Sequence, residues 1–184
     1  LGIGSVFIPP GDVLLAIGNA LFPALISAPE GAADIVLNFR MPRILLAVLT
    51  GVALAAAGAV MQGLLRNPLV SPFTLGLSSA ASFGAALMIV LGPAVFGAFF
   101  AGSVVFLGFE FTTKSLLLIL SAFLFGWLSV IIVYLISRVR QTSQAVMVLA
   151  GVVIGYLFQA GLLALKYVSN DDALREIVTW MMGG

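Results

Sequence analysis

Residues 44–65 read ILLAVLTGVALAAAGAVMQGLL, and this apolar stretch decides the fold class. A helix rises about 1.5 Å per residue, so the stretch extends over roughly 33 Å, enough to cross the hydrocarbon core of a bilayer. Only Thr50 and Gln62 interrupt it with polar side chains. The sequence therefore predicts a membrane-spanning helix at 44–65.

The composition of the whole chain agrees with that prediction. Of 184 residues, 62% are hydrophobic and 8% are charged, too few polar side chains to cover a water-soluble globule. The absence of cysteine and histidine excludes disulfides and cysteine-ligated metals and removes the commonest general base and metal ligand. The net charge of +1 gives no reason to expect a nucleic acid partner. We expect a multi-pass protein of the cell membrane, with lipid around it and without a metal site.

Three further stretches predict spanning helices, and all are apolar for most of a bilayer's thickness. Residues 73–91 form the second span, which we expect to stop at Gly92-Pro93 because proline disfavours helix in the residue before it. The third and fourth spans are residues 116–136 and 146–165. The expected fold is an all-α, polytopic transmembrane bundle that makes a single domain of residues 1–184.

The basic residues of the short loops predict the topology. Arg66, Arg138 and Arg140 should share the cytoplasmic side, which requires an even number of crossings between them. Residues 93–114 are therefore expected to be an outer loop, an interfacial segment or a re-entrant hairpin. The same topology places residues 1–43 outside the cytoplasm.

Two short amphipathic helices are expected on the outer side. In residues 11–22, Asp12 is the expected N-cap; in residues 171–182, the N-cap is expected to be Ser169 or Asn170. At roughly 11 residues, the second helix is too short to span a bilayer. The apolar faces are expected to be Val13, Leu14, Ile17 and Leu21 in the first, and Leu174, Ile177, Val178 and Met181 in the second.

Arg40 and Arg43, in the sequence RMPR, lie just before the first span and on the side where positive charge is unusual. They could bind lipid phosphates or hold local carbonyl groups. Alternatively, they could wait for carboxylates of an extracytoplasmic partner, because arginine forms bidentate, charge-assisted pairs with acids.

The sequence RNPLVSP (66–72) places two prolines in one short turn after the first span. A tight inter-helix loop is the simpler interpretation. However, a single breaker suffices for such a loop. The asparagine at 67 can bond freed backbone groups and the leucine at 69 could plug a gap, which favours a cavity lining or a gate at Asn67, Pro68 and Leu69.

The fourth span carries Gly151 and Gly155 at a spacing that lets helices approach closely, which favours ordinary helix packing. Gln159 extends that face and could line a polar pathway, although an interhelical hydrogen bond is the simpler role. No catalytic residues are predicted, since the four spans lack acids. Outside them, Glu110 and Lys114 could form a local ion pair.

Four blocks in fixed order resemble the permease subunits of vitamin B12, haem and ferric-siderophore ABC importers, the type II or FecCD family. The blocks are RMPR (40–43), GVALAAAGAVMQGLLRNPLVSPFTLGLSSAASFGAAL (51–87), VLAGVVIGYLFQAGLLAL (148–165) and DDALREIVTWMMGG (171–184). The resemblance implies part of a ten-helix subunit, from the end of its first helix to the short helix after its fifth. It also implies a homodimer, two ATP-binding cassette subunits and an extracytoplasmic substrate-binding protein.

The resemblance also implies roles for single residues. Arg40 and Arg43 match family arginines that dock onto glutamates of the binding protein. Asn67 and Leu69 match a loop that closes the cytoplasmic end of the path. Thr142 and Ser143 are weaker candidates for the same closure, because the loop length differs from the family pattern.

The expected function is that of a permease subunit that imports iron chelates such as siderophores, haem or cobalamin by alternating access. The chain would be no enzyme and hold no cofactor, because ATP would be bound and hydrolysed by a separate partner chain. The alternatives are a secondary transporter or channel and a non-transporting membrane scaffold. Residues 93–114 are longer than the family pattern leads us to expect.

Overall fold

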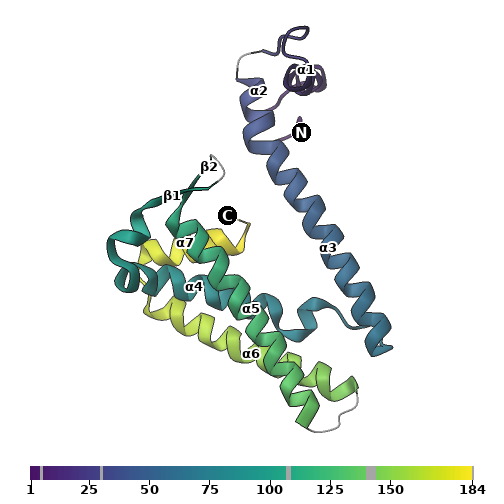
Figure 1. The fold of residues 1–184 in the computed structure, drawn as a ribbon, viewed down its shortest axis with the longest axis vertical. Coiled ribbons are helices and arrows are strands. Elements are labelled where there is room, and N and C mark those ends of the chain that lie inside the picture. The colour runs from purple at the N-terminus through teal and green to yellow at the C-terminus, as the bar shows by residue number, and fades with distance from the viewer. Residues whose placement is uncertain (5, 30, 107–108, 140–143, 184) are drawn as a thin grey trace. The chain divides into compact units, whose positions relative to one another are not determined.

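The computed structural model describes residues 1–4, 6–29, 31–106, 109–139 and 144–183. Almost all regular structure in these ranges is helical, with one short β-hairpin as the exception (Figure 1). The chain divides into two compact units, Leu1–Ala57 and Gly58–Gly184. The expected all-α fold is confirmed.

The first unit contains the short N-terminal helices and the first part of the helix that makes the first span. These are α1 (Pro10–Leu21), α2 (Ala32–Asp34), the π-helical turn η1 (Ile35–Arg40) and the first part of α3 (Met41–Leu65). A small core joins α1 to the start of this helical run, built from Ile8, Val13, Ala16 and Val36.

The start of α1 differs from the prediction. The helix begins at Pro10 with Pro9 at the N-cap position, so Asp12 lies inside the first turn and the prediction of Asp12 as N-cap was wrong. Proline suits the first helical position because the N–H it lacks would have no helical partner there. On the expected apolar face, Val13 is buried in the small core, whereas Leu14 and Leu21 are 70% and 68% exposed.

The first span begins earlier than expected. Residues 32–65 form one continuous helical run, so Arg40 and Arg43 lie within it and not before it. Pro42 cannot donate a hydrogen bond to the preceding turn. Pro42 lies directly after the wider π-helical turn at 35–40, where the pattern of backbone hydrogen bonds changes.

The second unit contains the remaining three long helices and the segments between them. In chain order its elements after α3 are η2 (Pro72–Leu75), α4 (Leu77–Phe96), η3 (Gly97–Ala101), β1 (Ser103–Phe106), β2 (Phe109–Thr112), α5 (Thr113–Val139), α6 (Gln144–Val168) and α7 (Asp171–Met181).

The second span is shifted relative to the prediction of 73–91. Residues 72–75 form a 3₁₀ turn, and α4 then continues through Pro93 to Phe96. The expected stop at Gly92-Pro93 was therefore wrong. Gly92 gives room to the ring of Phe100, which would lie 2.4 Å from a Cβ at that position. The helix ends instead at Gly97, whose φ of +53° suits glycine.

The described residues of 93–114 form the end of α4, the turn η3, the antiparallel strands β1 and β2 and the first two residues of α5. Within the described residues, four helices are long and apolar enough to cross a membrane, and this segment adds no fifth. The two strands were not predicted, because valine and phenylalanine there fit a buried helix as well as a strand. The side of the membrane on which the segment lies stays a prediction.

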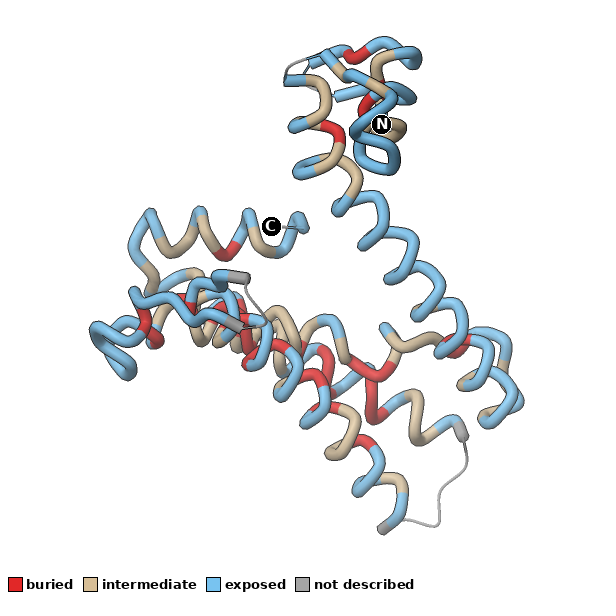
Figure 2. The backbone as a smooth tube through the Cα atoms, turned by 45° about the horizontal axis from the view of Figure 1, so that its top comes forward, coloured by how far each residue is buried: buried red, intermediate tan, exposed pale blue. Residues whose placement is uncertain are grey.

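Helices α4, α5 and α6 pack together around small and aromatic side chains, and buried positions concentrate where they cross (Figure 2). Phe83, Phe125 and Phe158, one from each helix, have ring centroids 5.3 to 6.2 Å apart. Gly84 of α4 lies against the backbone of Ser121 in α5, where a Cβ would be 2.7 Å from the serine carbonyl oxygen. Such small residues allow the close contacts typical of membrane helices.

Two buried serines bond backbone carbonyl groups across this unit. The hydroxyl of Ser121 donates to the carbonyl oxygen of Gly84 at 2.7 Å, and that of Ser129 donates to the carbonyl oxygen of Leu75 at 2.9 Å. Hydroxyls in apolar surroundings need such partners, because an unpaired polar group costs free energy. The first bond fixes α5 against α4 itself, and the second fixes it against the turn before α4.

The closest backbone approach joins the turn before α4 to α6. Gly76, with a φ of +72°, lies so near Gly155 that a Cβ on Gly76 would be 2.8 Å from the Gly155 Cα. A Cβ on Gly151 would lie 2.5 Å from the carbonyl oxygen of Thr74. Since backbone atoms oppose each other here, glycine is required on both sides of the contact.

Helix α7 begins as predicted, since the Asn170 side chain accepts a hydrogen bond from the backbone N–H of Ala173 at 2.8 Å. It packs on the core through Ala173, Ile177 and Trp180. Of the predicted apolar stripe, Ile177 is 1% exposed, whereas Val178 and Met181 are both 42% exposed.

The ion pair at the base of the hairpin differs from the prediction. Lys114 pairs with Glu176 of α7 at 2.7 Å and not with Glu110. The ammonium group also lies 5.9 Å from the centroid of the Phe100 ring. Lys114 therefore links the start of α5 to α7.

We predict that Gly151→Val lowers the free energy of unfolding by about 1 to 3 kcal/mol. The carbon atoms that valine adds would meet backbone atoms, which cannot rotate aside as a side chain can. The measurement is thermal unfolding of the detergent-solubilised protein, followed by size-exclusion chromatography after heating. Gly11→Ala is the matched control, since no atom lies within 4 Å of a Cβ at that exposed helical position. Equal unfolding temperatures for Gly151→Val and Gly11→Ala would contradict the close approach.

Candidate functional site

The candidate residues fall into two groups, one in each compact unit. Arg40 and Arg43 lie in the first unit, and the turn at 66–70 with the glycine face of α6 lies in the second.

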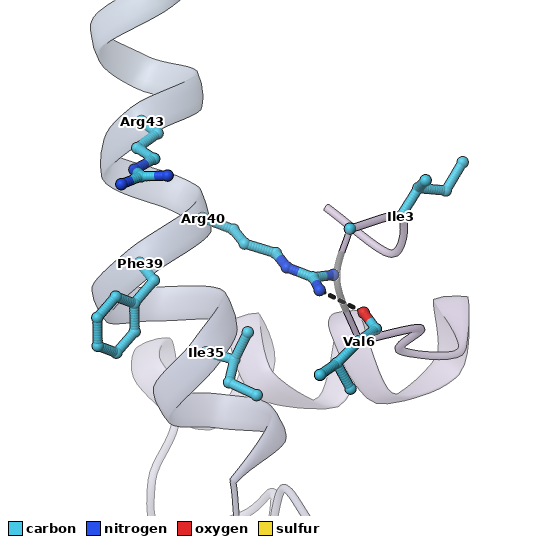
Figure 3. Close-up of a pocket in the computed structure, with 7 residues that line it drawn as sticks. Ile3, Val6, Ile35, Phe39, Arg40 and Arg43 are labelled. Carbon is cyan, nitrogen blue, oxygen red and sulfur yellow. Dashed lines mark hydrogen bonds between the residues drawn. The ribbon is translucent and has the colours of Figure 1, made fainter. Parts of the chain in front are cut away.

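Arg40 ends the π-helical turn and Arg43 lies three residues further along the same helical run. Both line a cavity of about 420 Å³, together with Ile3, Gly4, Val6, Ile35 and Phe39 (Figure 3). The cavity therefore combines two guanidinium groups with apolar side chains from the N-terminal segment and the helix.

The two arginines differ in their partners. Arg40 is half-buried, and its guanidinium donates hydrogen bonds to the carbonyl oxygens of Leu1 and Val6. Arg43 is exposed and makes no hydrogen bond or ion pair with the described residues. Of the two alternatives weighed for this pair, holding local carbonyls is what Arg40 does. No local pattern in the sequence indicated that Leu1 and Val6 lie beside Arg40.

The turn after α3 is held by local hydrogen bonds. The side chain oxygen of Asn67 accepts from the backbone N–H of Leu69 at 3.0 Å, and the N–H of Asn67 donates to the carbonyl oxygen of Gln62 at 3.2 Å. Arg66 takes a φ of +43°, an uncommon value for a residue other than glycine. The expected bonding of freed backbone groups by Asn67 is present.

The leucine of this turn does not fill a gap within its unit. Leu69 is 83% exposed, whereas its neighbour Val70 is 1% exposed. Gln62 donates from its side chain to the carbonyl oxygen of Val70 at 3.3 Å, which ties the turn to the end of α3. Sequence reasoning noted Gln62 only as an interruption of the span, and its polar side chain near the helix end was the available signal.

Gly151 and Gly155 lie in the backbone contact with the turn before α4, as described above. One turn further along α6, Gln159 makes no hydrogen bond with the described residues, so the expected interhelical bond is not found there. Gln159 instead lines a cavity of about 400 Å³ with Ser79, Val152, Gly155 and Tyr156. Sequence reasoning missed Ser79 and Tyr156, which mark this cavity as partly polar.

Thr142 and Ser143 lie outside the described residues. Among the described residues, no group of histidine, cysteine, aspartate and glutamate is arranged to hold a metal ion. The buried polar side chains of the same part of the chain are Thr113, Ser121 and Ser129, none of which is charged. The described residues thus place neither paired acids nor a nucleophile with a base in the membrane-spanning part.

Comparison with known proteins gives the context of these sites. The chain is 35% identical over 184 residues to a hemin transport system permease protein of Yersinia pestis, covering 93% of this chain and 50% of the relative. It is 33% identical over 188 residues to a molybdate import system permease protein of Haemophilus influenzae, covering 100% of this chain and 48% of the relative. The chain spans about half the length of these relatives.

A solved metal-chelate type ABC transporter in an inward-facing conformation has a similar fold. The TM-score is 0.64 with 28% sequence identity, over 95% of this chain and 52% of that chain. The four apolar helices and the relatives together identify an integral membrane protein. The model of the FecCD transport family matches residues 1–184, the whole sequence, and the chain therefore belongs to that family.

Proposed function

We propose that this chain is part of the membrane-spanning subunit of an ATP-driven importer that receives its cargo from an extracytoplasmic binding protein. The observation that carries the proposal is the family match over residues 1–184, since relatives of this family are permease components of import systems. The chain makes no covalent chemistry in this proposal. Its contribution is to surround the path and to change the packing of its helices.

The face that bears Arg40 and Arg43 is the proposed docking surface for the binding protein. Its cavity combines cationic and apolar groups, which suits acidic side chains of a partner protein. A membrane lipid phosphate is the competing occupant. The docking role requires this face to lie outside the cytoplasm.

The turn at Asn67, Pro68 and Leu69 is the proposed cytoplasmic gate. The exposed Leu69 side chain is available to a neighbouring helix or a second subunit, and Asn67 fixes its backbone. Alternating access would then open and close one end of the path by a discrete change in helix packing. Gln159 and its cavity beside Gly155 are proposed to line that path.

The proposed partners follow from the same importer architecture. They are a second permease subunit, giving a homodimer, two ATP-binding cassette subunits and the binding protein. ATP would be bound by the cassette subunits and not by this chain, which would itself hold no cofactor.

The proposed cargo is a metal-containing compound. Relatives at similar identity are named for hemin and for molybdate, so overall similarity does not select between cargoes. Iron chelates such as siderophores, haem and cobalamin belong to the same broad class, and molybdate extends it to a metal oxyanion. The shared chemistry is a metal centre delivered in a complexed form.

A secondary transporter is the second candidate. Such a protein commonly couples transport through an ionisable group inside the membrane. The described residues bury no charged side chain, which disfavours this alternative. The third candidate, a membrane scaffold, would be insensitive to changes at the turn of 66–70.

We predict that Arg43 and Arg66 lie on opposite sides of the membrane. In the full-length protein freed of other cysteines, a single cysteine at 43 should react with a membrane-impermeant maleimide in intact spheroplasts, and one at 66 should not. Each site should react after permeabilisation, which serves as the control. Labelling at 66 alone would exclude both the docking surface and the cytoplasmic gate.

We predict that transport depends on ATP hydrolysis by the partner subunits. Proteoliposomes with the full permease, its cassette subunits and its binding protein should take up one of four probes: a ferric siderophore, hemin, cobalamin or molybdate. Uptake should require enclosed ATP and be absent with a non-hydrolysable analogue. Uptake driven by a proton or sodium gradient without ATP would instead support a secondary transporter.

We predict that Asn67→Ala impairs the gate because it removes the acceptor for the Leu69 N–H, a bond worth about 1 kcal/mol. Uptake should fall several-fold while ATP hydrolysis by the cassette subunits continues. Asn67→Asp keeps the acceptor oxygen and should retain most of the uptake. Unchanged uptake for Asn67→Ala would leave the turn as an ordinary connection.

A further inference from the structure

The two arginines of the proposed docking surface are not equivalent in their hydrogen bonds. The Nη2 group of Arg40 donates to the carbonyl oxygen of Val6 (Figure 3). Its Nη1 group donates to the carbonyl oxygen of Leu1. Arg43 makes no hydrogen bond or ion pair within the described residues and is exposed. A difference in partners of this kind predicts a difference in role.

The N-terminal turn, whose described residues are 1–4 and 6–8, is shaped around the Arg40 guanidinium. The backbone N–H of Ile8 donates to the carbonyl oxygen of Gly2 at 3.0 Å, which closes the turn. A Cβ on Gly4 would lie 2.8 Å from Nη2 of Arg40, so any larger residue there presses on the guanidinium. Ile8, 4% exposed, anchors the end of the turn in the small core with Val36.

The bonds of Arg40 reduce its capacity to bind an acid. A carboxylate is held best when two N–H groups of one guanidinium point at its two oxygens in parallel. In Arg40, both terminal nitrogens already donate to backbone carbonyls that lie in different parts of the N-terminal turn. All five donors of Arg43 remain available to a partner.

We propose that Arg43 supplies the carboxylate-binding group of the docking surface, and that Arg40 is a positioning residue that holds the N-terminal turn against the helix. The inference rests on the proposed docking function and divides it between the two residues. In this arrangement the turn forms one wall of the cavity, and Arg40 keeps that wall in place.

The cavity also indicates what accompanies the acid. Beside Arg43, its lining includes the apolar side chains of Ile3, Val6, Ile35 and Phe39. Its volume of about 420 Å³ lies in the range of pockets that accept specific side chains or small ligands. The fitting partner is a protein loop that carries an acidic side chain next to an apolar one.

The first test measures the N-terminal turn by hydrogen exchange in the full-length permease. Arg40→Gln should speed exchange of the Ile8 amide about tenfold or more, since the turn loses its anchor, whereas Arg43→Gln should leave it unchanged. Gly4→Val is the second variant, because it displaces the guanidinium without removing its charge and should speed the same exchange. Protection that is unaffected by Arg40→Gln and Gly4→Val would overturn the positioning role.

The second test titrates the full-length permease with the substrate-binding protein of the same importer at several salt concentrations. Arg43→Gln should raise Kd about tenfold or more and flatten its salt dependence, as expected for loss of an interfacial charge pair. Arg43→Lys should keep the salt dependence without restoring the full affinity. Gly4→Val should weaken binding while keeping the wild-type salt dependence, because both charges remain.

The outcomes separate failure of this inference from failure of the docking function. If Arg40→Gln flattens the salt dependence and Arg43→Gln does not, docking stands and the division of roles is overturned. If no variant changes Kd while exchange confirms folded protein, the docking function itself fails. If Arg43→Gln weakens binding only to vesicles containing phosphatidylglycerol, the site belongs to lipid and the inference is overturned.

Discussion

The contact between the backbone of α6 and the turn before α4 is the constraint on which the second unit depends. Gly76 takes a positive φ, and Gly151 and Gly155 oppose it without side chains, so peptide groups meet where side chains normally keep helices apart. The position of this crossing determines where α4 starts, which in turn places Ser129 under the carbonyl oxygen of Leu75. Hydrophobicity alone does little to specify how apolar helices pack against one another in a membrane. Such close backbone contacts specify where the helices cross.

The turn at 66–70 is built onto this crossing. Between the end of α3 and Gly76, the chain makes one turn held by Asn67 and then a 3₁₀ turn that starts at Pro72. The first proline belongs to the exposed turn, whereas the second begins a helical segment whose far end is the glycine contact. The two prolines that looked alike in the sequence thus serve different structural purposes, and only the first is associated with an exposed leucine.

Hydropathy was sufficient to predict the four spans, because 20 or so apolar residues have few other stable uses. It was insufficient for their ends. Gly92-Pro93 did not stop α4, which continues to Phe96 with Phe100 packed against Gly92. Asp12 did not cap α1 because Pro10 starts the helix first. The unusual position of their positive charge was enough to single out Arg40 and Arg43 in the sequence. The carbonyl partners of Arg40 depend instead on how a distant segment folds, which no local pattern encodes.

The π-helical turn at Ile35–Arg40 also affects how the N-terminal segment is oriented about the first span. A π-helical turn amounts to one extra residue within an α-helix, and an α-helix advances about 100° per residue. Because the wider turn takes up that extra residue, deletion of one residue there would restore a regular α-helix with the N-terminal segment still on nearly the same face. Deletion of one residue from the regular part of α3 would instead rotate that segment by about 100° relative to the rest of the helix. The π-helical turn thus keeps the N-terminal segment in its direction around the helix axis while adding one residue of length.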